Sequence, residues 1–238
     1  VQGNNLNNLN PLTDTSIFLA KSGENRGYKI FYYEPENLSI KNKKVFANGS
    51  FIKIDYSKRK FFKIIKKTNI DLSKVKFILV RQDPPFNLEY ISTTYILDTI
   101  KNKVRVINNP TSIRNVSEKL YSMKFINFMP DTIFTKKVED ILYFYKKYKK
   151  IILKPIHSYS GNDIIFINNK LNKKLILKFI KKHGYIMCQK FLPKIKFGDK
   201  RVFIINGKIC GCISRVPKAG SILSNMSTGA KPKLIKLS

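Results

Sequence analysis

The chain has 238 residues, with 46 Lys and Arg against 15 Asp and Glu, so its formal net charge is +31 at pH 7. A hydrophobic fraction of 43% and an aromatic fraction of 12% supply enough apolar side chains for a packed core, which excludes a wholly disordered chain. No apolar run approaches the roughly 20 residues that cross a bilayer, so we expect no membrane partner.

The first half of the chain alternates between strand and helix patterns. A capped helix begins near Thr13, and a turn follows at Gly27. We then expect a strand at 30–35, a hairpin at 38–55 that contains the turn signal Asn48-Gly49, a basic helix at 58–67, a buried strand at 75–80, a helix at 89–100 and a strand at 104–108. Because strands that alternate with helices favour crossover connections, this half predicts a mostly parallel sheet with flanking helices.

A second region begins at Pro110. Helical patterns cover 112–128, 138–148 and 171–183, and strand patterns cover 151–155, 164–167, 185–189, 201–205 and 208–214. Asn206-Gly207 is a strong two-residue turn signal that makes the last two strands a hairpin. We therefore predict an α/β (α+β) fold with two domains, residues 1–112 and residues 113–238, the second built on antiparallel strands.

Two basic residues stand beside or within buried strands. Arg81 follows the apolar run 75–80 and precedes two prolines that stiffen the loop. Ligands of open α/β sheets gather outside the carboxyl ends of the strands, so Arg81 is placed to hold an anion. On its own, however, the motif is more typical of a solvent-exposed arginine where the chain leaves a strand. Lys154 lies in the apolar run 151–155, where an unpaired ammonium must reach solvent or meet an anion.

The loop that follows Lys154 is a weak phosphate signal. It reads His157-Ser158-Tyr159-Ser160-Gly161-Asn162, and backbone N–H groups in such a polar loop can cradle a phosphate, although it holds only one glycine. Neither a P-loop nor a G-x-G-x-x-G motif occurs in the chain. A nucleotide enzyme of this sequence must therefore hold its ligand by other means.

The cysteines carry no metal-binding pattern. Their number is odd and their spacing is not that of metal ligands, which is typical of reduced thiols and a cytoplasmic protein. Buried thiols are expected in three strand-like segments, at Cys188, Cys210 and Cys212.

Short motifs of one enzyme family occur here in the family's order. They are Arg81-Gln82-Asp83-Pro84-Pro85-Phe86 with Thr94-Tyr95-Ile96-Leu97, Asn109-Pro110 with Glu118-Lys119-Leu120, Ile151-Ile152-Leu153-Lys154-Pro155, Gln189-Lys190-Phe191-Leu192-Pro193, Gly198-Asp199-Lys200-Arg201-Val202 and Arg215-Val216-Pro217. On these motifs the chain resembles the prokaryotic glutathione synthetases of the ATP-grasp superfamily, over residues 13–237. The motifs R-x-D-P-P-F and G-D-K-R-V are specific in combination.

The resemblance implies an ATP-dependent ligase that joins glycine to γ-glutamylcysteine through an acyl-phosphate. It makes 1–112 a substrate domain and 113–238 an ATP-grasp domain. It also implies an ATP-binding role for ten residues: Lys119, Lys154, Ser160, Gly161, Asn162, Gln189, Lys190, Phe191, Leu192 and Asp199. Among these, Lys119 and Lys154 would face the phosphates, 189–192 would touch adenine, and Asp199 would lie on the ribose side.

Four further residues receive a role from the resemblance. The residues that would bind substrate are Arg81, Arg201, Arg215 and Asn225. Arg201 and Arg215 would also be catalytic, because they hold substrate carboxylates and the acyl-phosphate. The family further implies Mg²⁺ as cofactor and a homo-oligomer.

The chain departs from the family pattern in its lid loop and near its end. An arginine usual in the family is Leu223 here, and the loop glycines are reduced to Gly161. Asp199 is the last acidic residue, so 200–238 contains no carboxylate side chain. Two magnesium ions on a nucleotide need carboxylate ligands. We therefore expect metal ligands beyond Ser238 and none within the chain, a first strand missing before Val1, and an inactive fragment.

The positive charge permits other functions. Thirty-nine of the 46 basic residues are Lys, and the chain is rich in residues with A/T-rich codons, so codon bias explains the charge better than a specific nucleic-acid partner does. A polybasic nucleic-acid-binding module without catalysis remains one alternative. A related ATP-grasp carboxylate–amine ligase with another substrate is the second, and R-x-D-P-P-F argues against it.

Overall fold

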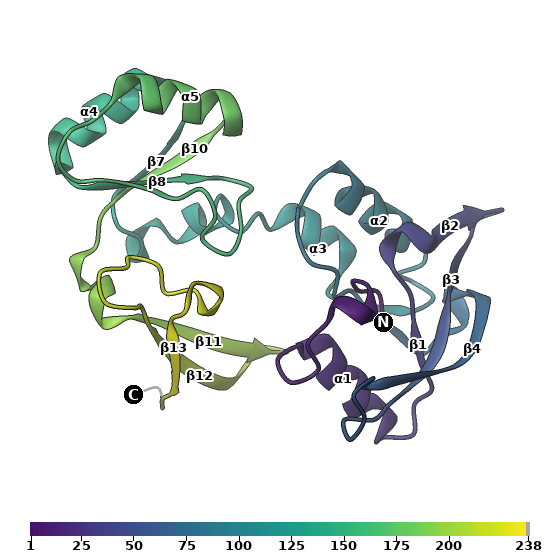
Figure 1. Cartoon of the computed structure of the whole chain (residues 1–238). Coiled ribbons are helices and arrows are strands. Elements are labelled where there is room, and N and C mark those ends of the chain that lie inside the picture. Colours follow the sequence, from purple (N-terminus) through teal and green to yellow (C-terminus); the bar gives the residue numbers. More distant parts are fainter. Residues whose placement is uncertain (237–238) are drawn as a thin grey trace. The chain divides into compact units, whose positions relative to one another are not determined.

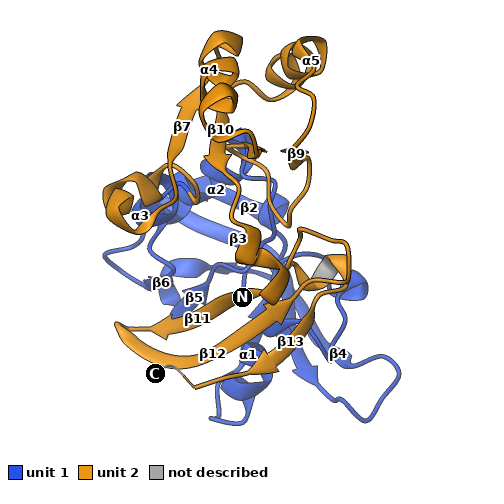
Figure 2. Cartoon of the chain, turned by 90° about the vertical axis from the view of Figure 1, so that its left-hand side faces the viewer, with its two compact units in different colours: residues 1–117 blue, residues 118–238 orange. Residues whose placement is uncertain are grey.

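The chain divides into two compact units, Val1–Ser117 and Glu118–Ser238 (Figures 1 and 2). The computed structural model describes residues 1–236. The predicted boundary after residue 112 falls inside helix α3 (Pro110–Asn115), which belongs to unit 1. In the part of the chain that is described, no helix is long and apolar enough to span a membrane.

Unit 1 is built on an antiparallel sheet. Its four strands are β1 (Ile30–Tyr32), β2 (Leu38–Lys41), β3 (Lys44–Ile54) and β4 (Phe62–Asp71). The long β3 pairs antiparallel with each of the other three. The prediction of a mostly parallel sheet is therefore wrong for this half, although the α/β class is confirmed. Within residues 1–117, parallel pairing is confined to a two-stranded sheet of β5 (Phe77–Leu79) and β6 (Arg105–Ile107) and to isolated bridges at Gln2.

The predicted basic helix at 58–67 is also wrong, because most of this segment belongs to β4. Phe62 pairs with Ile54, and Lys63 pairs with Lys53. Phe62 is buried in the sheet, whereas Lys63 is exposed. The chain turns near Asn42, and Asn48-Gly49 lies inside β3 instead of forming the hairpin turn.

Gln2 links the two sheets of unit 1. It forms parallel bridges to Tyr33, which follows β1, and to Val80, which follows β5. Its backbone N–H donates to the Leu79 carbonyl at 2.9 Å, and the N–H of Gly3 donates to the Tyr33 carbonyl at 3.1 Å. The first residues of the chain therefore occupy a central position between β1 and β5.

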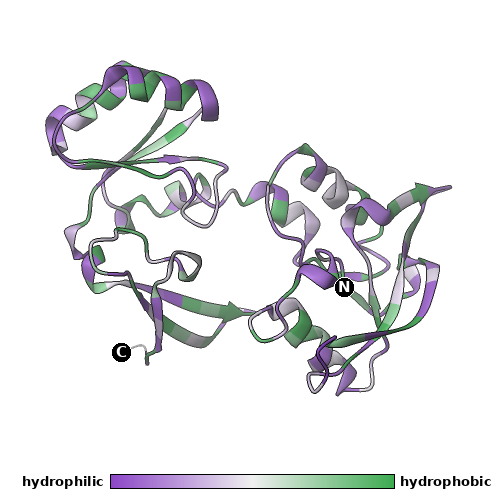
Figure 3. Cartoon of the chain, viewed as in Figure 1, coloured by the Kyte–Doolittle hydropathy of each residue, from purple (hydrophilic) through white to green (hydrophobic). Residues whose placement is uncertain are grey.

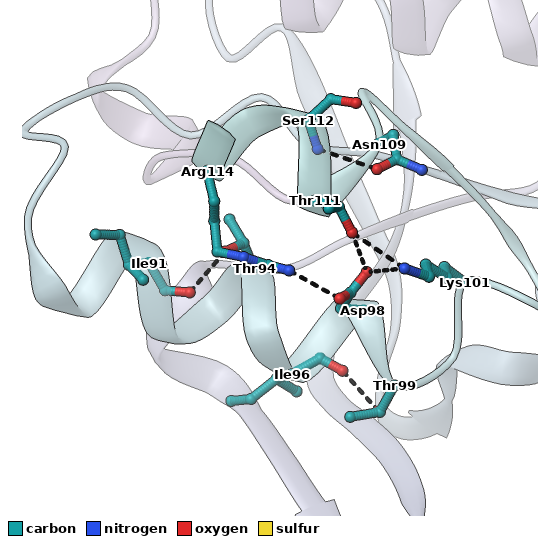
Figure 4. Close-up of polar contacts among 10 residues, drawn as sticks. All are labelled: Ile91, Thr94, Ile96, Asp98, Thr99, Lys101, Asn109, Thr111, Ser112 and Arg114. Carbon is teal, nitrogen blue, oxygen red and sulfur yellow. Dashed lines mark hydrogen bonds and ion pairs between the residues drawn. The ribbon is translucent and has the colours of Figure 1, made fainter. Parts of the chain in front are cut away.

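A polar network holds α3 against α2 (Leu88–Asp98) (Figure 4). The carboxylate of Asp98 accepts from Arg114 at 2.8 Å and from Thr111 at 2.9 Å, and it pairs with Lys101 at 2.9 Å. The Arg114 guanidinium also lies over the Tyr95 ring, 4.2 Å from its centroid. These contacts explain why unit 1 extends past residue 112. The other helix of this unit is α1 (Thr15–Glu24), which is capped by Asp14.

Unit 2 begins with an antiparallel sheet that is covered by two helices. Its strands are β7 (Thr132–Thr135), β8 (Ile151–Pro155), β9 (Ile165–Ile167) and β10 (Ile186–Lys190), in the order β7-β10-β8-β9. Helices α4 (Val138–Tyr148) and α5 (Lys173–His183) carry hydrophilic and hydrophobic residues along their length (Figure 3). Their apolar faces bury Ile141 and Ile176 against Leu153 and Cys188 of the sheet.

A second antiparallel sheet completes unit 2. It contains β11 (Asp199–Ile205), β12 (Lys208–Val216) and β13 (Lys231–Leu234). The predicted turn Asn206-Gly207 joins β11 to β12, and both of its residues have positive φ angles. Cys210 is exposed in this sheet, so the prediction of a buried thiol is wrong there. The helix predicted at 112–128 is interrupted: α3 ends at Asn115, and a 3-10 helix covers Tyr121–Phe128.

Candidate functional site

A cavity of about 230 Å³ lies within unit 2. Strands β8, β10 and β11 contribute to its wall, together with the segment after β10 and the loop at 222–225. Seven residues with a predicted ATP or substrate role line it: Lys154, Gln189, Lys190, Phe191, Leu192, Asp199 and Asn225. Residues that lie up to 71 positions apart in the sequence therefore meet around one space.

Lys154 reaches this cavity because β8 alternates its faces. Its neighbours Leu153 and Pro155 are buried, whereas Lys154 shares the opposite face of the strand with Ile152. The ammonium group donates to Oε1 of Gln189 at 2.9 Å, and Nε2 of Gln189 donates to Oγ1 of Thr132 at 2.9 Å. Thr132 thereby orients the Gln189 amide so that its oxygen faces the lysine.

Lys119 supplies a second partly buried ammonium group, which is held by the segment that follows β8. Its Nζ donates to the backbone carbonyls of Ile156 at 3.4 Å and Ser158 at 2.5 Å. Burial lowers the pKa of both lysines, and the charge of Lys119 lowers the pKa of Lys154 further. Glu118 lies 3.9 Å from Lys119, but its side chain is 75% exposed. Among the described residues, no buried carboxylate is recorded as pairing with either ammonium.

Partly desolvated ammonium groups such as these favour an anionic ligand on physical grounds. Two like charges that lie near each other in a partly desolvated environment repel, and this electrostatic cost falls when an anion binds between them. A polyphosphate supplies several oxygens that can accept from both lysines at once. The arrangement therefore favours a phosphate-bearing ligand over a neutral one.

The polar loop after β8 meets the loop at 222–225. Ser160 and Gly161 have positive φ angles of 55° and 80°. A Cβ atom on Gly161 would lie 3.0 Å from Oδ1 of Asn225 and 3.5 Å from Leu223, so these two loops are in close contact. Asp163, at the end of the first loop, pairs with Lys182 of α5 at 3.1 Å.

The rest of the wall is apolar except for Ser224, and it was not predicted as part of the site. Phe191 stacks against Phe166 with ring centroids 4.3 Å apart. The additional lining residues are Ile152, Ile164, Ile195, Ile222, Leu223 and Ser224. The period of two along β8 could have identified Ile152, because it shares a face with Lys154. The sequence carries no comparable signal for 222–224.

The three predicted substrate arginines lie in different surroundings. Arg215 pairs with Asp199, whereas Arg201 is exposed on the same face of the sheet. Arg81 belongs to unit 1, where its Nε donates to Oγ of Ser16 at 3.3 Å. None of the three arginines is among the residues that line the cavity, and the same holds for four of the predicted ATP-binding residues: Lys119, Ser160, Gly161 and Asn162.

Comparisons with known proteins identify the family of the chain. Residues 1–114 match the family model "Prokaryotic glutathione synthetase, N-terminal domain", and residues 118–238 match "Prokaryotic glutathione synthetase, ATP-grasp domain". The chain belongs to the prokaryotic glutathione synthetase family. The family expected from the sequence motifs is thus confirmed, and an ATP-grasp domain implies use of ATP.

Individual members of the glutathione synthetase family are similar along nearly the whole chain. The glutathione synthetase of Buchnera aphidicola subsp. Acyrthosiphon pisum is 35% identical over 238 residues, which are 98% of this chain and 74% of that protein. That of Mesorhizobium japonicum is 34% identical and covers 100% of this chain and 77% of that protein. A solved ATP-grasp ligase of Chryseobacterium gregarium, in complex with ADP and with a leader and core peptide, shares the fold with a TM-score of 0.58 at 11% identity, over 92% of this chain and 72% of that one.

The described residues do not fit a magnesium site. Residues 1–236 contain no group of three or more His, Cys, Asp or Glu side chains that could hold a metal ion. Asp199, the acid that lines the cavity, has both carboxylate oxygens bonded to Arg215. We therefore assign no step of the reaction to a metal ion.

Proposed function

We propose that this protein takes part in the glutathione synthase reaction, the ATP-dependent ligation of glycine to γ-glutamylcysteine. The single observation that carries the proposal is the position of Lys154, which lines a cavity of unit 2 and whose ammonium group donates to the neutral Gln189 amide. Membership of the glutathione synthetase family supports the choice of substrates, and the ATP-grasp domain supports the choice of nucleotide.

The reaction proceeds in two steps on this proposal. An oxygen of the cysteinyl carboxylate attacks the γ-phosphorus of ATP, the bond to the β,γ-bridging oxygen breaks, and ADP leaves. The glycine amine then attacks the acyl carbon of the acyl-phosphate, inorganic phosphate leaves, and the amine loses a proton. Negative charge spreads over the transferred phosphoryl group in the first step, so cations placed beside it lower the barrier.

The residues of unit 2 have separate tasks in this scheme. Lys154 and Lys119 bind the phosphates, and Gln189 keeps the Lys154 ammonium directed into the cavity. The segment 189–192 and its apolar neighbours bind the adenine ring. Ser160, Gly161 and Asn162 close over the phosphates, and Asn225 contacts substrate from the facing loop. Arg201 and Arg215 hold the acyl-phosphate, and Arg81 of unit 1 holds a substrate carboxylate.

Calorimetric titration of the 238-residue chain with ATP tests the nucleotide site. We expect saturable ATP binding, because Lys154 and several apolar residues line the same cavity. Failure to bind ATP contradicts the proposal. The carboxylate substrate is tested by adding γ-glutamylcysteine to the ATP complex and measuring the melting temperature. A further rise in melting temperature identifies γ-glutamylcysteine as the substrate. A rise with another dipeptide instead indicates a related carboxylate–amine ligase.

Turnover is a separate question from binding. We propose that the 238-residue chain alone has little ligase activity, because residues 200–238 contain no carboxylate that can hold a metal on the nucleotide. The assay is glycine-dependent phosphate release from ATP in the presence of γ-glutamylcysteine and Mg²⁺. Turnover typical of efficient enzymes, on the order of 10 s⁻¹, contradicts this part of the proposal without affecting the nucleotide site.

A further inference from the structure

A polar cavity of about 310 Å³ lies in unit 1, on one face of its antiparallel sheet. Tyr32 of β1, Ser50 of β3 and Lys67 of β4 are register partners across the three strands, and all three residues line the cavity. Residues that stand directly opposite each other in an antiparallel sheet share a face. The three strands therefore form the floor of this cavity.

The floor is polar because β3 changes character along its length. Ile54 and Ile52 lie on the same face of β3, where they pack with Ile17 of α1 in a buried cluster. The next two residues on this face are Ser50 and Asn48, and both line the cavity. The apolar part of the face is thus occupied by α1, and the polar part faces the cavity.

The side walls carry a high share of asparagine. They come from the segment 5–7 and from the segment that follows β1. Nδ2 of Asn5 donates to Oε1 of Glu34 at 3.0 Å, and Oδ1 of Asn5 accepts from Nδ2 of Asn7 at 3.1 Å. These amide contacts orient the Glu34 carboxylate at the edge of the cavity.

Two side chains of opposite charge line the cavity. Glu34 follows β1 and Lys67 lies in β4, so β3 runs between them. Within residues 1–236, neither side chain is recorded in an ion pair. Burial raises the pKa of Glu34, and the charge of Glu36 raises this pKa further. A cation bound at Glu34 would offset both effects.

This charge pattern fits a small zwitterion. Neighbouring strands are about 4.8 Å apart, so β1 and β4 are separated by about 10 Å. The long side chains of Glu34 and Lys67 can both contact a small ligand that lies over β3. A phosphate would be repelled by Glu34 and Glu36, and a simple cation would be repelled by Lys67. An apolar ligand would leave the asparagine amides without partners.

We propose that this cavity binds an α-amino-acid head group, with the ammonium group of the ligand at Glu34 and its carboxylate at Lys67. The identity of the ligand rests on the proposed function. The glutamyl end of γ-glutamylcysteine carries a free α-ammonium group and a free α-carboxylate, and glycine carries the same two groups. Neither Glu34 nor Lys67 received a role from the family resemblance.

The test compares γ-glutamylcysteine with two analogues by titration calorimetry of the 238-residue chain. Glutaryl-cysteine lacks the α-amino group, and γ-aminobutyryl-cysteine lacks the α-carboxylate. We expect the unmodified chain to bind γ-glutamylcysteine about tenfold more tightly than either analogue. In Glu34→Gln, the preference over glutaryl-cysteine should fall to within about twofold, and the preference over γ-aminobutyryl-cysteine should persist. Lys67→Met should show the reverse pattern.

A control and a second ligand complete the experiment. Lys63→Met removes an exposed lysine of the same strand that does not line the cavity, and it should leave both preferences unchanged. Titration with glycine distinguishes the two sources of the head group. Weaker glycine binding in both Glu34→Gln and Lys67→Met, with unchanged preferences among the dipeptides, supports the proposed chemistry and assigns the cavity to glycine.

Three results overturn the inference. The first is that neither variant changes the binding of the dipeptides or of glycine. The second is that both variants weaken all ligands equally and lower the melting temperature, which indicates a role in folding alone. The third is an unmodified chain that binds ATP but neither γ-glutamylcysteine nor glycine. Because Lys67 is exposed, Lys67→Met keeps the test decisive if Glu34→Gln folds poorly. Failure to bind ATP contradicts the proposed function, and the dipeptide and glycine titrations still decide the inference.

Discussion

The Lys154 ammonium lies 2.9 Å from Oε1 of Gln189, and this neutral amide is the only side-chain acceptor recorded for it among residues 1–236. A partly buried lysine that is paired with an amide instead of a carboxylate stays available for an anionic ligand. Its positive charge nevertheless opposes folding, because desolvation lowers its pKa. Stability and ligand binding therefore make opposite demands on this residue.

We predict that Lys154→Met weakens ATP binding about 10–100-fold and slightly raises the melting temperature. The loss corresponds to one hydrogen bond to a charged group, about 1.5–3 kcal/mol. The gain follows from removing a partly buried charge that pairs with no carboxylate within residues 1–236. Calorimetry and thermal denaturation measure the two effects. Lys181→Met, on the exposed side of α5, is the control and should change neither quantity much. Equal effects of both substitutions contradict a special role for Lys154.

The contact between Gly161 and Asn225 gives a second prediction. Gly161→Ala should weaken ATP binding, because the added methyl group meets Asn225 Oδ1 at 3.0 Å and pushes the two loops apart. Gly207→Ala is a matched control, since that glycine has a similar φ of 75° but nothing within 4 Å of its Cβ position. Both substitutions place alanine in a left-handed conformation at a cost of roughly 1–2 kcal/mol.

Thermal denaturation and ATP titration of these two alanine variants separate strain from contact. The melting temperature should fall for both, and ATP affinity should fall only for Gly161→Ala. An unchanged ATP affinity in Gly161→Ala shows that the contact with the 222–225 loop is unrelated to nucleotide binding.

Local patterns identified most of unit 2 but misassigned the sheet of unit 1. Helices α4 and α5 show the apolar period of a surface helix, and Asn206-Gly207 is read without ambiguity as a turn. The segment 58–67 has lysines spaced as on a helix, yet pairing with β3 buries Phe62 and overrides that local preference. The antiparallel sheet depends on this long-range pairing, which a single sequence does not display.

In the candidate site, too, the sequence predicts some residues and misses others. The motifs located Lys154, Gln189 and Asp199 because their residue types are chemically informative. The apolar residues Ile222 and Leu223 carry no such signal, and their place in the cavity wall depends on a loop whose course no local pattern specifies. Likewise, the pairing of Asp199 with Arg215 depends on the register of β11 and β12.

The exposure of the three cysteines predicts their reactivity. Cys210 is exposed, whereas Cys188 and Cys212 are buried, and burial raises the pKa of Cys188 to about 12. Because the thiolate is the reactive form, we expect one thiol to react rapidly with a disulfide reagent at pH 8 and two to react only after unfolding. Cys210→Ser should abolish the rapid reaction of this one thiol with the disulfide reagent. Rapid labelling of two thiols in that variant contradicts the packing of both sheets in unit 2.

The network at Asp98 makes the stability of unit 1 depend on pH. Hydrogen bonds from Lys101, Arg114 and Thr111 lower the pKa of Asp98 to about 2, against an ordinary value of 3.8. The folded state therefore binds this proton less readily than the unfolded state. The resulting stabilisation is fully present above pH 4 and is lost as the pH falls towards 2. Because the carboxylate is 21% exposed, solvent screening limits the contribution to about 1–2 kcal/mol.

We therefore expect Asp98→Asn to lower the free energy of unfolding of unit 1 by about 1–2 kcal/mol at pH 7, and by about half as much at pH 3. Urea denaturation at a series of pH values measures the difference between the variant and the unmodified chain. Asp131→Asn, an exposed acid outside the network, is the control and should show no such dependence. A difference that stays constant from pH 7 to pH 3 contradicts the assignment, because a role of Asp98 that does not involve its charge is insensitive to its protonation.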